Sequence, residues 1–266
     1  MRPSRRNELW YRGQLHALVG HLRAAGAEIL AAIKPQWPTV TDAAPPGLDF
    51  LLTHAKLKFG NIGAFAKARA ATAVRKNLDD VDERLAASVK QSLNIDIRAQ
   101  LTGEGPVAME MARAARANVD LIESIPEQYF DRLREDITEN WATGQPWSAI
   151  VDRVQEIGQI TERRAALIAR DQTGKLNAAF NNVRQRELGI EKFEWQTAED
   201  ERVRDSHAEL DGQTFRWDSP PIVDGETATP GTPINCRCVA GPVFDIEETP
   251  AESPIAAEME AESEAA

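Results

Sequence analysis

The sequence is poor in the features that mark disulfide-rich, membrane or secreted proteins. It holds only two cysteines among 266 residues, which cannot supply a disulfide framework. No stretch approaches the ~20 apolar residues of a membrane-spanning helix. The basic start is followed by Arg12, His16 and Arg23, where a signal peptide needs an unbroken apolar run. We therefore expect no contact with a membrane, and a protein made in a cytoplasm and kept there or carried off in an assembly.

The motifs of common catalytic sites are missing as well. The chain has no glycine-rich phosphate loop, no nucleophile elbow and no helix with paired histidines. Its formal net charge is −11, which argues against non-specific coating of DNA, because that affinity comes from neutralising phosphates. Eight of the acidic residues, and no basic one, lie from Asp245 to the end. Residues 245–266 also lack aromatic side chains, so we expect a disordered acidic tail behind a nearly neutral body.

The first half of the chain has the spacing of helices. Apolar residues three and four apart predict an N-terminal helix within residues 1–34. Four prolines and a glycine in residues 35–47 predict a linker. Residues 48–106 are rich in alanine, lysine, arginine and leucine, and form a helical region to which no role is assigned.

The strongest helical pattern lies in residues 107–189. Ile125-Pro126 and Gly144-Gln145-Pro146 divide it into three predicted helices. Thr161 is the expected N-cap of a long last helix, and Gly189 its C-cap glycine. Gly174 inside that helix predicts a kink or a close packing contact.

After Gly189 the period of the pattern changes from helix to strand. Phe193 and Trp195 alternate with polar residues, Phe215 and Trp217 repeat this after Asp211-Gly212, and a third apolar run covers 239–244. We expect a loop over residues 218–235. The predicted fold class is α+β: a mainly α-helical N-terminal body, a small β-containing C-terminal module at 190–244, and the acidic tail.

The residues with the most distinctive chemistry are His207, Cys236 and Cys238. Imidazole and thiolate are the ligands that zinc prefers, and a small module gains much from a metal cross-link. A fourth ligand would be Asp200, Asp205, Asp211 or water. Cysteines one residue apart on a straight strand point the same way, however, which leaves little freedom to close a tetrahedron. The competing interpretation is that both cysteines are small buried hydrophobic residues and that His207 is a hydrogen-bonded turn residue.

Several short motifs in one order resemble a known family. They include Arg170-Asp171, Asn177, Trp195-Gln196-Thr197-Ala198, Asp200, Arg202-Val203-Arg204, His207, Leu210-Asp211-Gly212, Pro230-Gly231 and Asn235-Cys236-Arg237-Cys238. The order and spacing of these motifs, over roughly residues 120–244, resemble those of the phage Mu protein F-like family of minor head proteins, also called phage head morphogenesis proteins. We accordingly place a Mu F-like head morphogenesis domain at 107–244.

The resemblance implies a minor component of the virion or procapsid of a tailed bacteriophage. It would act near the portal in head morphogenesis and influence DNA packaging or exit. The portal protein and other procapsid components are the implied partners, with incidental contact with phage DNA. The matching Arg170 and Asp171 are expected to form a buried or half-buried salt bridge that ties the long helix to the β module. No enzymatic activity is expected.

The alternative function is a metal-dependent nuclease or other hydrolase. His207 would be its general base, and Asp200 or Asp205 would hold a cation. Two of the nearby ligands are cysteines, which suit a closed structural zinc better than an open catalytic site.

Overall fold

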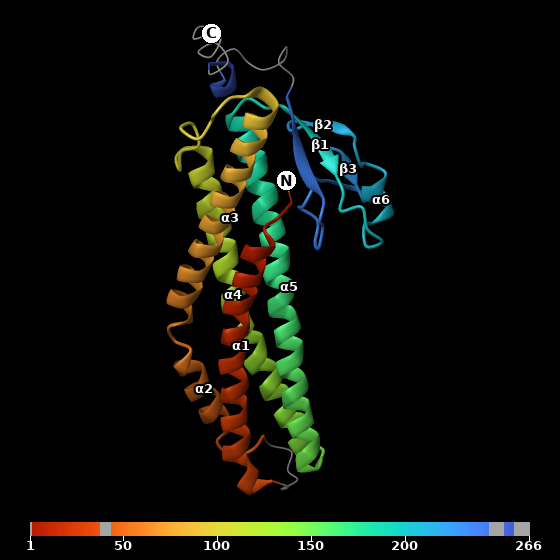
Figure 1. The fold of residues 1–266 in the computed structure, drawn as a ribbon. Coiled ribbons are helices and arrows are strands. Elements are labelled where there is room, and N and C mark those ends of the chain that lie inside the picture. Colours follow the sequence, from red (N-terminus) through yellow and green to blue (C-terminus); the bar gives the residue numbers. More distant parts are fainter. Residues whose placement is uncertain (1, 38–43, 245–252, 258–266) are drawn as a thin grey trace. The chain divides into compact units, whose positions relative to one another are not determined.

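A computed structural model describes residues 2–37, 44–244 and 253–257, and it confirms the α+β class (Figure 1). The elements in chain order are α1 (Arg5–Ile33), η1 (Lys34–Gln36), α2 (Leu48–Lys58), α3 (Ile62–Leu93), α4 (Pro106–Ala142), α5 (Trp147–Glu187), β1 (Lys192–Gln196), α6 (Asp205–Ala208), β2 (Thr214–Arg216), β3 (Ile222–Val223), β4 (Glu226–Thr227) and β5 (Val239–Val243). No helix within the described ranges is long and apolar enough to cross a membrane.

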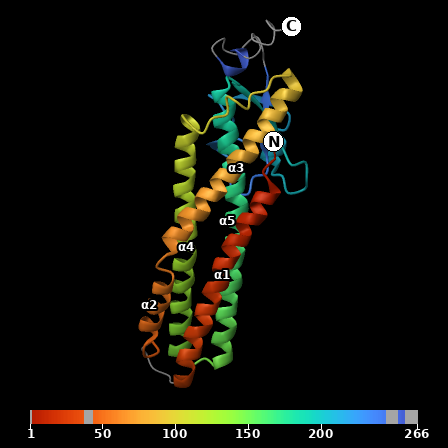
Figure 2. The ribbon, with the colours of Figure 1, turned by 60° about the vertical axis from the view of Figure 1, so that its left-hand side comes forward.

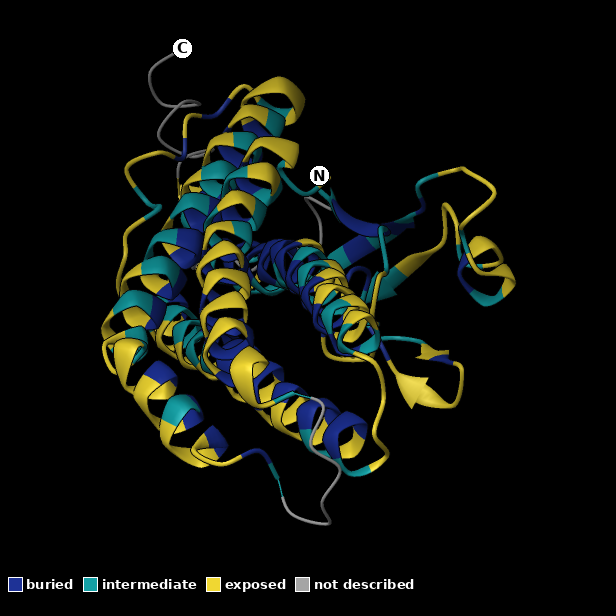
Figure 3. Cartoon of the chain, turned by 90° about the horizontal axis from the view of Figure 1, so that it is seen from below, coloured by how far each residue is buried: buried dark blue, intermediate teal, exposed yellow. Residues whose placement is uncertain are grey.

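The chain divides into two compact units. Unit 1 comprises residues 1–8, 72–115 and 170–266, and unit 2 comprises residues 9–71 and 116–169. These boundaries differ from the expected segments because α1, α3, α4 and α5 each contribute residues to both units. The long helices carry one buried and one exposed stripe, as a period of 3.6 residues dictates (Figure 3).

Unit 2 is built from helices that pack side by side (Figure 2). The Tyr11 hydroxyl of α1 donates a 2.9 Å hydrogen bond to Asn118 of α4, and both groups are buried. Arg23 of α1 forms an ion pair with Glu162 of α5. Burial raises the pKa of the Tyr11 hydroxyl far above its ordinary value. The hydroxyl therefore stays protonated and remains a hydrogen-bond donor.

The division of residues 107–189 into three helices was wrong, because α4 runs through Pro126. A proline inside a helix removes one backbone hydrogen bond and costs roughly 3 kcal/mol. Here apolar side chains are buried on both sides of it, including Ile122, Ile125 and Tyr129. Continuing the helix keeps all of them in the core, and this outweighs the local cost. The break at Gly144–Pro146 is confirmed, since α4 ends at Ala142 and α5 begins at Trp147.

Thr161 does not cap a helix, which corrects a second prediction. It lies inside α5, where its hydroxyl donates to the carbonyl oxygen of Ile157 at 2.8 Å. A threonine can bond the preceding turn in this way and remain in a helix interior. Gly189 does follow the end of α5 with a φ of 80°, as expected of a C-cap glycine.

The predicted sheet of unit 1 is confirmed, with strand order β2-β1-β5 and both pairs antiparallel. Phe193 faces Phe215 in one pair, and Trp195 faces Ala240 in the other. The sheet lies beside the C-terminal part of α5 (Figure 1), where Gln185 receives a hydrogen bond from the Trp217 indole and donates one to the Ala240 carbonyl.

The expected loop 218–235 contains a second, two-stranded sheet of β3 and β4. Asp224 and Gly225 form its turn, with φ values of 53° and 87°. An Asp-Gly pair is a strong hairpin signal because both central residues of a type I′ turn need positive φ.

The acidic tail falls largely on residues 245–252 and 258–266, which lie outside the described residues. Residues 254–257 form a helical turn, so the expected disorder does not hold there. Ile255 is only 2% exposed and joins an apolar cluster with Leu85, Val89 and Leu188. This part of the tail therefore packs on the body of unit 1.

Candidate functional site

Two parts of unit 1 bring His207, Cys236 and Cys238 together. His207 lies on the short helix α6, and the two cysteines lie in the irregular segment directly before β5. One ligand atom from each residue lies within 4.8 Å of the others. The Nδ1 atom of His207 is 3.5 Å from the Sγ atom of each cysteine. The residues singled out from the sequence thus form one cluster.

The cluster is largely shielded from solvent. His207 is 2% exposed and Cys238 is 3% exposed, whereas Cys236 is half-buried. The Trp195 ring meets the imidazole edge to face, at 5.5 Å between ring centroids. The Nε2 atom of His207 is buried and has no hydrogen-bond partner among the described residues. A buried polar atom of this kind is uncommon and points to a special environment.

The two sulfur atoms are electrostatically unequal. A hydrogen bond from the Cys238 thiol lowers the pKa of Cys236 to about 5, and backbone N–H groups of Cys238 and Gly231 add to the effect. The same interaction, together with burial, raises the pKa of Cys238 well above its ordinary value. The shared hydrogen bond therefore favours loss of one proton from the pair and opposes loss of the second.

Asn235 anchors the cysteine segment to α5. Its side-chain oxygen accepts hydrogen bonds from Arg170 at 2.7 and 3.2 Å, and its backbone N–H donates to Asp171 at 3.1 Å. Asn235 has a φ of 59°, a left-handed conformation that asparagine tolerates better than most residues. Sequence reasoning placed Asn235 in a motif but assigned it no role.

The expected salt bridge of Arg170 and Asp171 needs correction. Both residues do link α5 to the β module, but each does so through Asn235. The carboxylate of Asp171 forms its ion pair with Lys175, one turn along the same helix. The predicted connection between α5 and the β module is therefore present, but it consists of hydrogen bonds to Asn235 and not of a salt bridge between Arg170 and Asp171.

Gly231 allows the same segment to approach α5 closely. At Gly174 a Cβ atom would lie 3.7 Å from the Cys236 carbonyl oxygen, which is ordinary contact, so the segment packs on the helix there without needing a glycine. At Gly231, which has a φ of 89°, a Cβ atom would come within 3.0 Å of Ala178. Only glycine combines that φ with so little space.

The carboxylates of Asp200, Asp205 and Asp211, which were considered as a fourth ligand, either form other interactions or lie outside the cluster. Asp200 pairs with the Arg237 guanidinium through both oxygens, and these bonds hold the pKa of Asp200 far below its usual range. Asp211 accepts a 2.6 Å hydrogen bond from the Thr197 backbone N–H. Asp205 is exposed at the start of α6. Among the described residues, no carboxylate oxygen belongs to the cluster.

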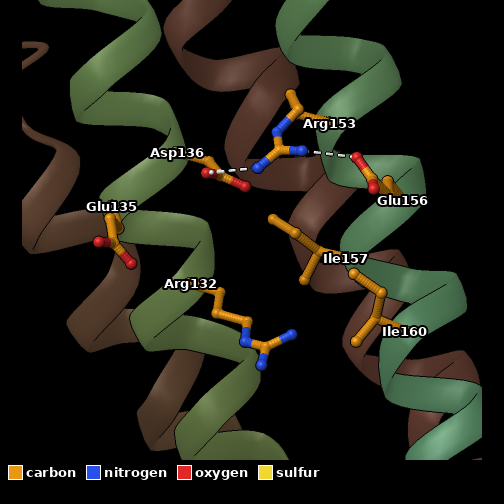
Figure 4. Close-up of a pocket in the computed structure, with 7 residues that line it drawn as sticks. All are labelled: Arg132, Glu135, Asp136, Arg153, Glu156, Ile157 and Ile160. Atoms are coloured by element: carbon orange, nitrogen blue, oxygen red, sulfur yellow. Dashed lines mark hydrogen bonds and ion pairs between the residues drawn. The ribbon is translucent and has the colours of Figure 1, made fainter.

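Unit 2 has a pocket of about 180 Å³ between α4 and α5 (Figure 4). Arg153 reaches across it, with ion pairs to Asp136 at 3.2 Å and to Glu156 at 2.6 Å. Its remaining lining is Arg132, Glu135, Ile157 and Ile160. Charges of both signs neutralise each other here, so the pocket offers less distinctive chemistry than the thiol and imidazole cluster.

Comparisons with known proteins agree with the motifs. The family model described as "Phage Mu protein F like protein" matches residues 131–241, a range that includes His207, Cys236 and Cys238. An uncharacterized protein of Haemophilus influenzae is 32% identical over 269 residues, which cover 98% of this chain and 58% of that protein. The chain thus spans little more than half the length of this relative. No solved structure matches.

Proposed function

We propose that the chain is a minor head protein that acts close to the portal during assembly of a tailed phage, because residues 131–241 match the model of the phage Mu protein F-like family. The family is one of phage head morphogenesis, which implies a virion or procapsid protein that interacts with other capsid components. Association with the portal, and an influence on DNA packaging or ejection, are the finer parts of the proposal.

The observation that carries the proposal is the family match, which spans the cysteine cluster and its anchors on α5. Asn235 fixes the cysteine segment to the helix, and Arg237 fixes it to Asp200. A small module held at several points presents a surface of fixed shape. Such a surface suits docking on a symmetric assembly, where one geometry has to serve every contact.

The hydrolase alternative receives less support. It requires oxygen or nitrogen ligands around an open coordination position. Asp200 is engaged by Arg237, and among the described residues no oxygen atom of Asp205 belongs to the cluster around His207. The groups beside His207 are sulfur atoms, which suit a structural role better.

Co-sedimentation with the portal protein of the same phage tests the proposal directly. The full chain and the portal protein are co-expressed and separated on a density gradient, with the major capsid protein as the control partner. We expect co-migration with the portal and none with the control. In parallel, heads assembled without the protein should be defective in shape, number or DNA content. Normal heads together with separate migration would overturn the proposal, and hydrolysis restored by added magnesium or manganese would favour the alternative.

A further inference from the structure

We propose that the Nδ1 atom of His207 and the Sγ atoms of Cys236 and Cys238 bind one zinc ion. The ion would cross-link α6 to the segment before β5 within unit 1. This inference rests on the geometry of three side chains and is independent of the proposed role in head assembly.

The two nitrogen–sulfur distances in the cluster are those of a tetrahedral zinc site. With a Zn–S bond of about 2.3 Å and a Zn–N bond of about 2.0 to 2.1 Å, tetrahedral angles place nitrogen and sulfur about 3.5 Å apart. The Nδ1 atom of His207 lies 3.5 Å from both sulfur atoms, and all three ligand atoms lie within 4.8 Å of one another. The imidazole is therefore already placed to share one ion with each sulfur atom.

Hydrogen bonds alone account less well for the same geometry. The Cys238 thiol donates to Cys236, and the Nδ1 atom of a neutral imidazole, as donor or as acceptor, makes one strong hydrogen bond at a time. Two sulfur atoms nevertheless lie at equal distance from it. A cation between the three atoms satisfies all of them together, because each ligand then directs a lone pair at the same centre.

The Cys-Arg-Cys spacing is compatible with this arrangement because the segment is not a straight strand. β5 begins only at Val239, and Asn235 has a positive φ immediately before Cys236. The Cys236 backbone N–H donates to the Pro233 carbonyl and closes a turn. The bend turns both sulfur atoms toward His207, which a strand with the same spacing could achieve only with difficulty.

The surroundings of Cys236 stabilise a thiolate. The backbone N–H of Cys238 donates to the Sγ atom of Cys236 at 3.4 Å. The Arg237 side chain is drawn to Asp200 and contributes positive charge nearby without entering the cluster. Two thiolates with an imidazole form a donor set that suits zinc better than magnesium or calcium, which prefer oxygen ligands.

A cross-link at this position would matter because the β module is small. Its apolar cluster contains seven buried residues: Phe193, Trp195, Trp217, Val223, Ala228, Cys238 and Ala240. The metal would join residues 29 and 31 positions apart, across the loop that contains the β3–β4 hairpin. Since metal binding free energy becomes folding free energy, the ion would hold this loop closed.

Metal analysis of the full chain is the first test. The protein is purified under reducing conditions without chelator, and zinc and free thiols are counted in the same sample. We expect about one zinc per chain, and a fall to below about a tenth in Cys236→Ser, Cys238→Ser and His207→Gln. His54→Gln is the matched control, because His54 is an exposed histidine of unit 2, and it should keep the metal.

Cobalt replacement keeps the test decisive where a variant fails to fold. Wild-type protein is stripped with a chelator and titrated with Co²⁺, and thiolate-to-cobalt charge-transfer absorption is followed. We expect saturation at one equivalent, and X-ray absorption of the zinc form should show two sulfur ligands at about 2.3 Å. Two titratable thiols without bound zinc or cobalt would overturn the proposal, as would a disulfide between the cysteines or full zinc content in His207→Gln.

Discussion

Replacing Asn235 should loosen the β module by an amount that depends on backbone conformation as well as on lost contacts. Asn235 combines a φ of 59° with hydrogen bonds to Arg170 and Asp171 of α5. Asn235→Gly removes the side chain but tolerates the positive φ. Asn235→Ala removes the same side-chain contacts and also opposes the conformation. Comparing the two variants separates the two contributions.

The expected magnitudes follow from these losses. The Arg170 hydrogen bonds are exposed, so their loss costs about 0.5 to 1 kcal/mol. The left-handed conformation costs alanine roughly 1 to 2 kcal/mol. Ordering the more flexible glycine backbone costs about 0.5 to 1 kcal/mol. We therefore expect Asn235→Gly to cost about 1.5 kcal/mol and Asn235→Ala about 2 to 2.5 kcal/mol.

Hydrogen exchange followed by mass spectrometry is the suitable assay, because it reports opening of peptides from residues 190–244 separately from the helices. Arg170→Ala should cost only the free energy of the lost hydrogen bonds. Combined with Asn235→Gly it should cause little further loss of stability, because the two residues are direct partners. Equal protection in the glycine and alanine variants would refute the conformational part of the reasoning. Full additivity with Arg170→Ala would refute the contact part.

Two further predictions concern the helices. Asp82→Asn should lower the free energy of unfolding by about 2 kcal/mol in urea titrations, because Arg184 is 2% exposed and, of its charged partners in the described part of the chain, would keep only Glu187. The control is Asp79→Asn at an exposed position, with an expected loss below about 0.5 kcal/mol. Pro126→Ala should raise the melting temperature by restoring a backbone donor inside α4, for a net gain of about 1 to 2 kcal/mol, and an unchanged or lower melting temperature would show that the helix depends on the proline.

Much of the fold could be predicted because its signals are local. The alternation around Phe193 and Trp195 predicts a half-buried strand, and the structure has β1 there. The helix break predicted at Pro126 was wrong because the rule that proline ends a helix considers only the local cost. It does not consider the apolar side chains that are buried on both sides of the proline. The β3–β4 hairpin was missed because two-residue strands are too short to show alternation, although Asp224-Gly225 carried the turn signal.

The candidate site was predictable in chemistry and not in geometry. Histidine and cysteine are rare enough in this chain to be noticed, so the cluster of His207, Cys236 and Cys238 could be named in advance. The anchoring role of Asn235 could not, since its partners lie 64 and 65 positions earlier in the chain. The objection to Cys-x-Cys ligands assumed a strand. The bend at Asn235 removes that assumption, and no sequence rule assigns positive φ to one asparagine among several.

The acidic tail leads to the last prediction, about Ile255. Truncating a core isoleucine to alanine commonly costs 2 to 5 kcal/mol, but a short docked segment can detach, which limits the loss to its docking free energy. Burying Ile255 contributes about 1.5 to 3 kcal/mol, and the conformational entropy lost when residues 253–257 become ordered opposes docking. We therefore expect Ile255→Ala and truncation after Phe244 to lower the melting temperature equally, by about 2 to 4 °C. Calorimetry of the two variants decides the matter: a loss confined to the truncation would assign docking to other residues, and no loss in either would restore the expectation of a dispensable tail.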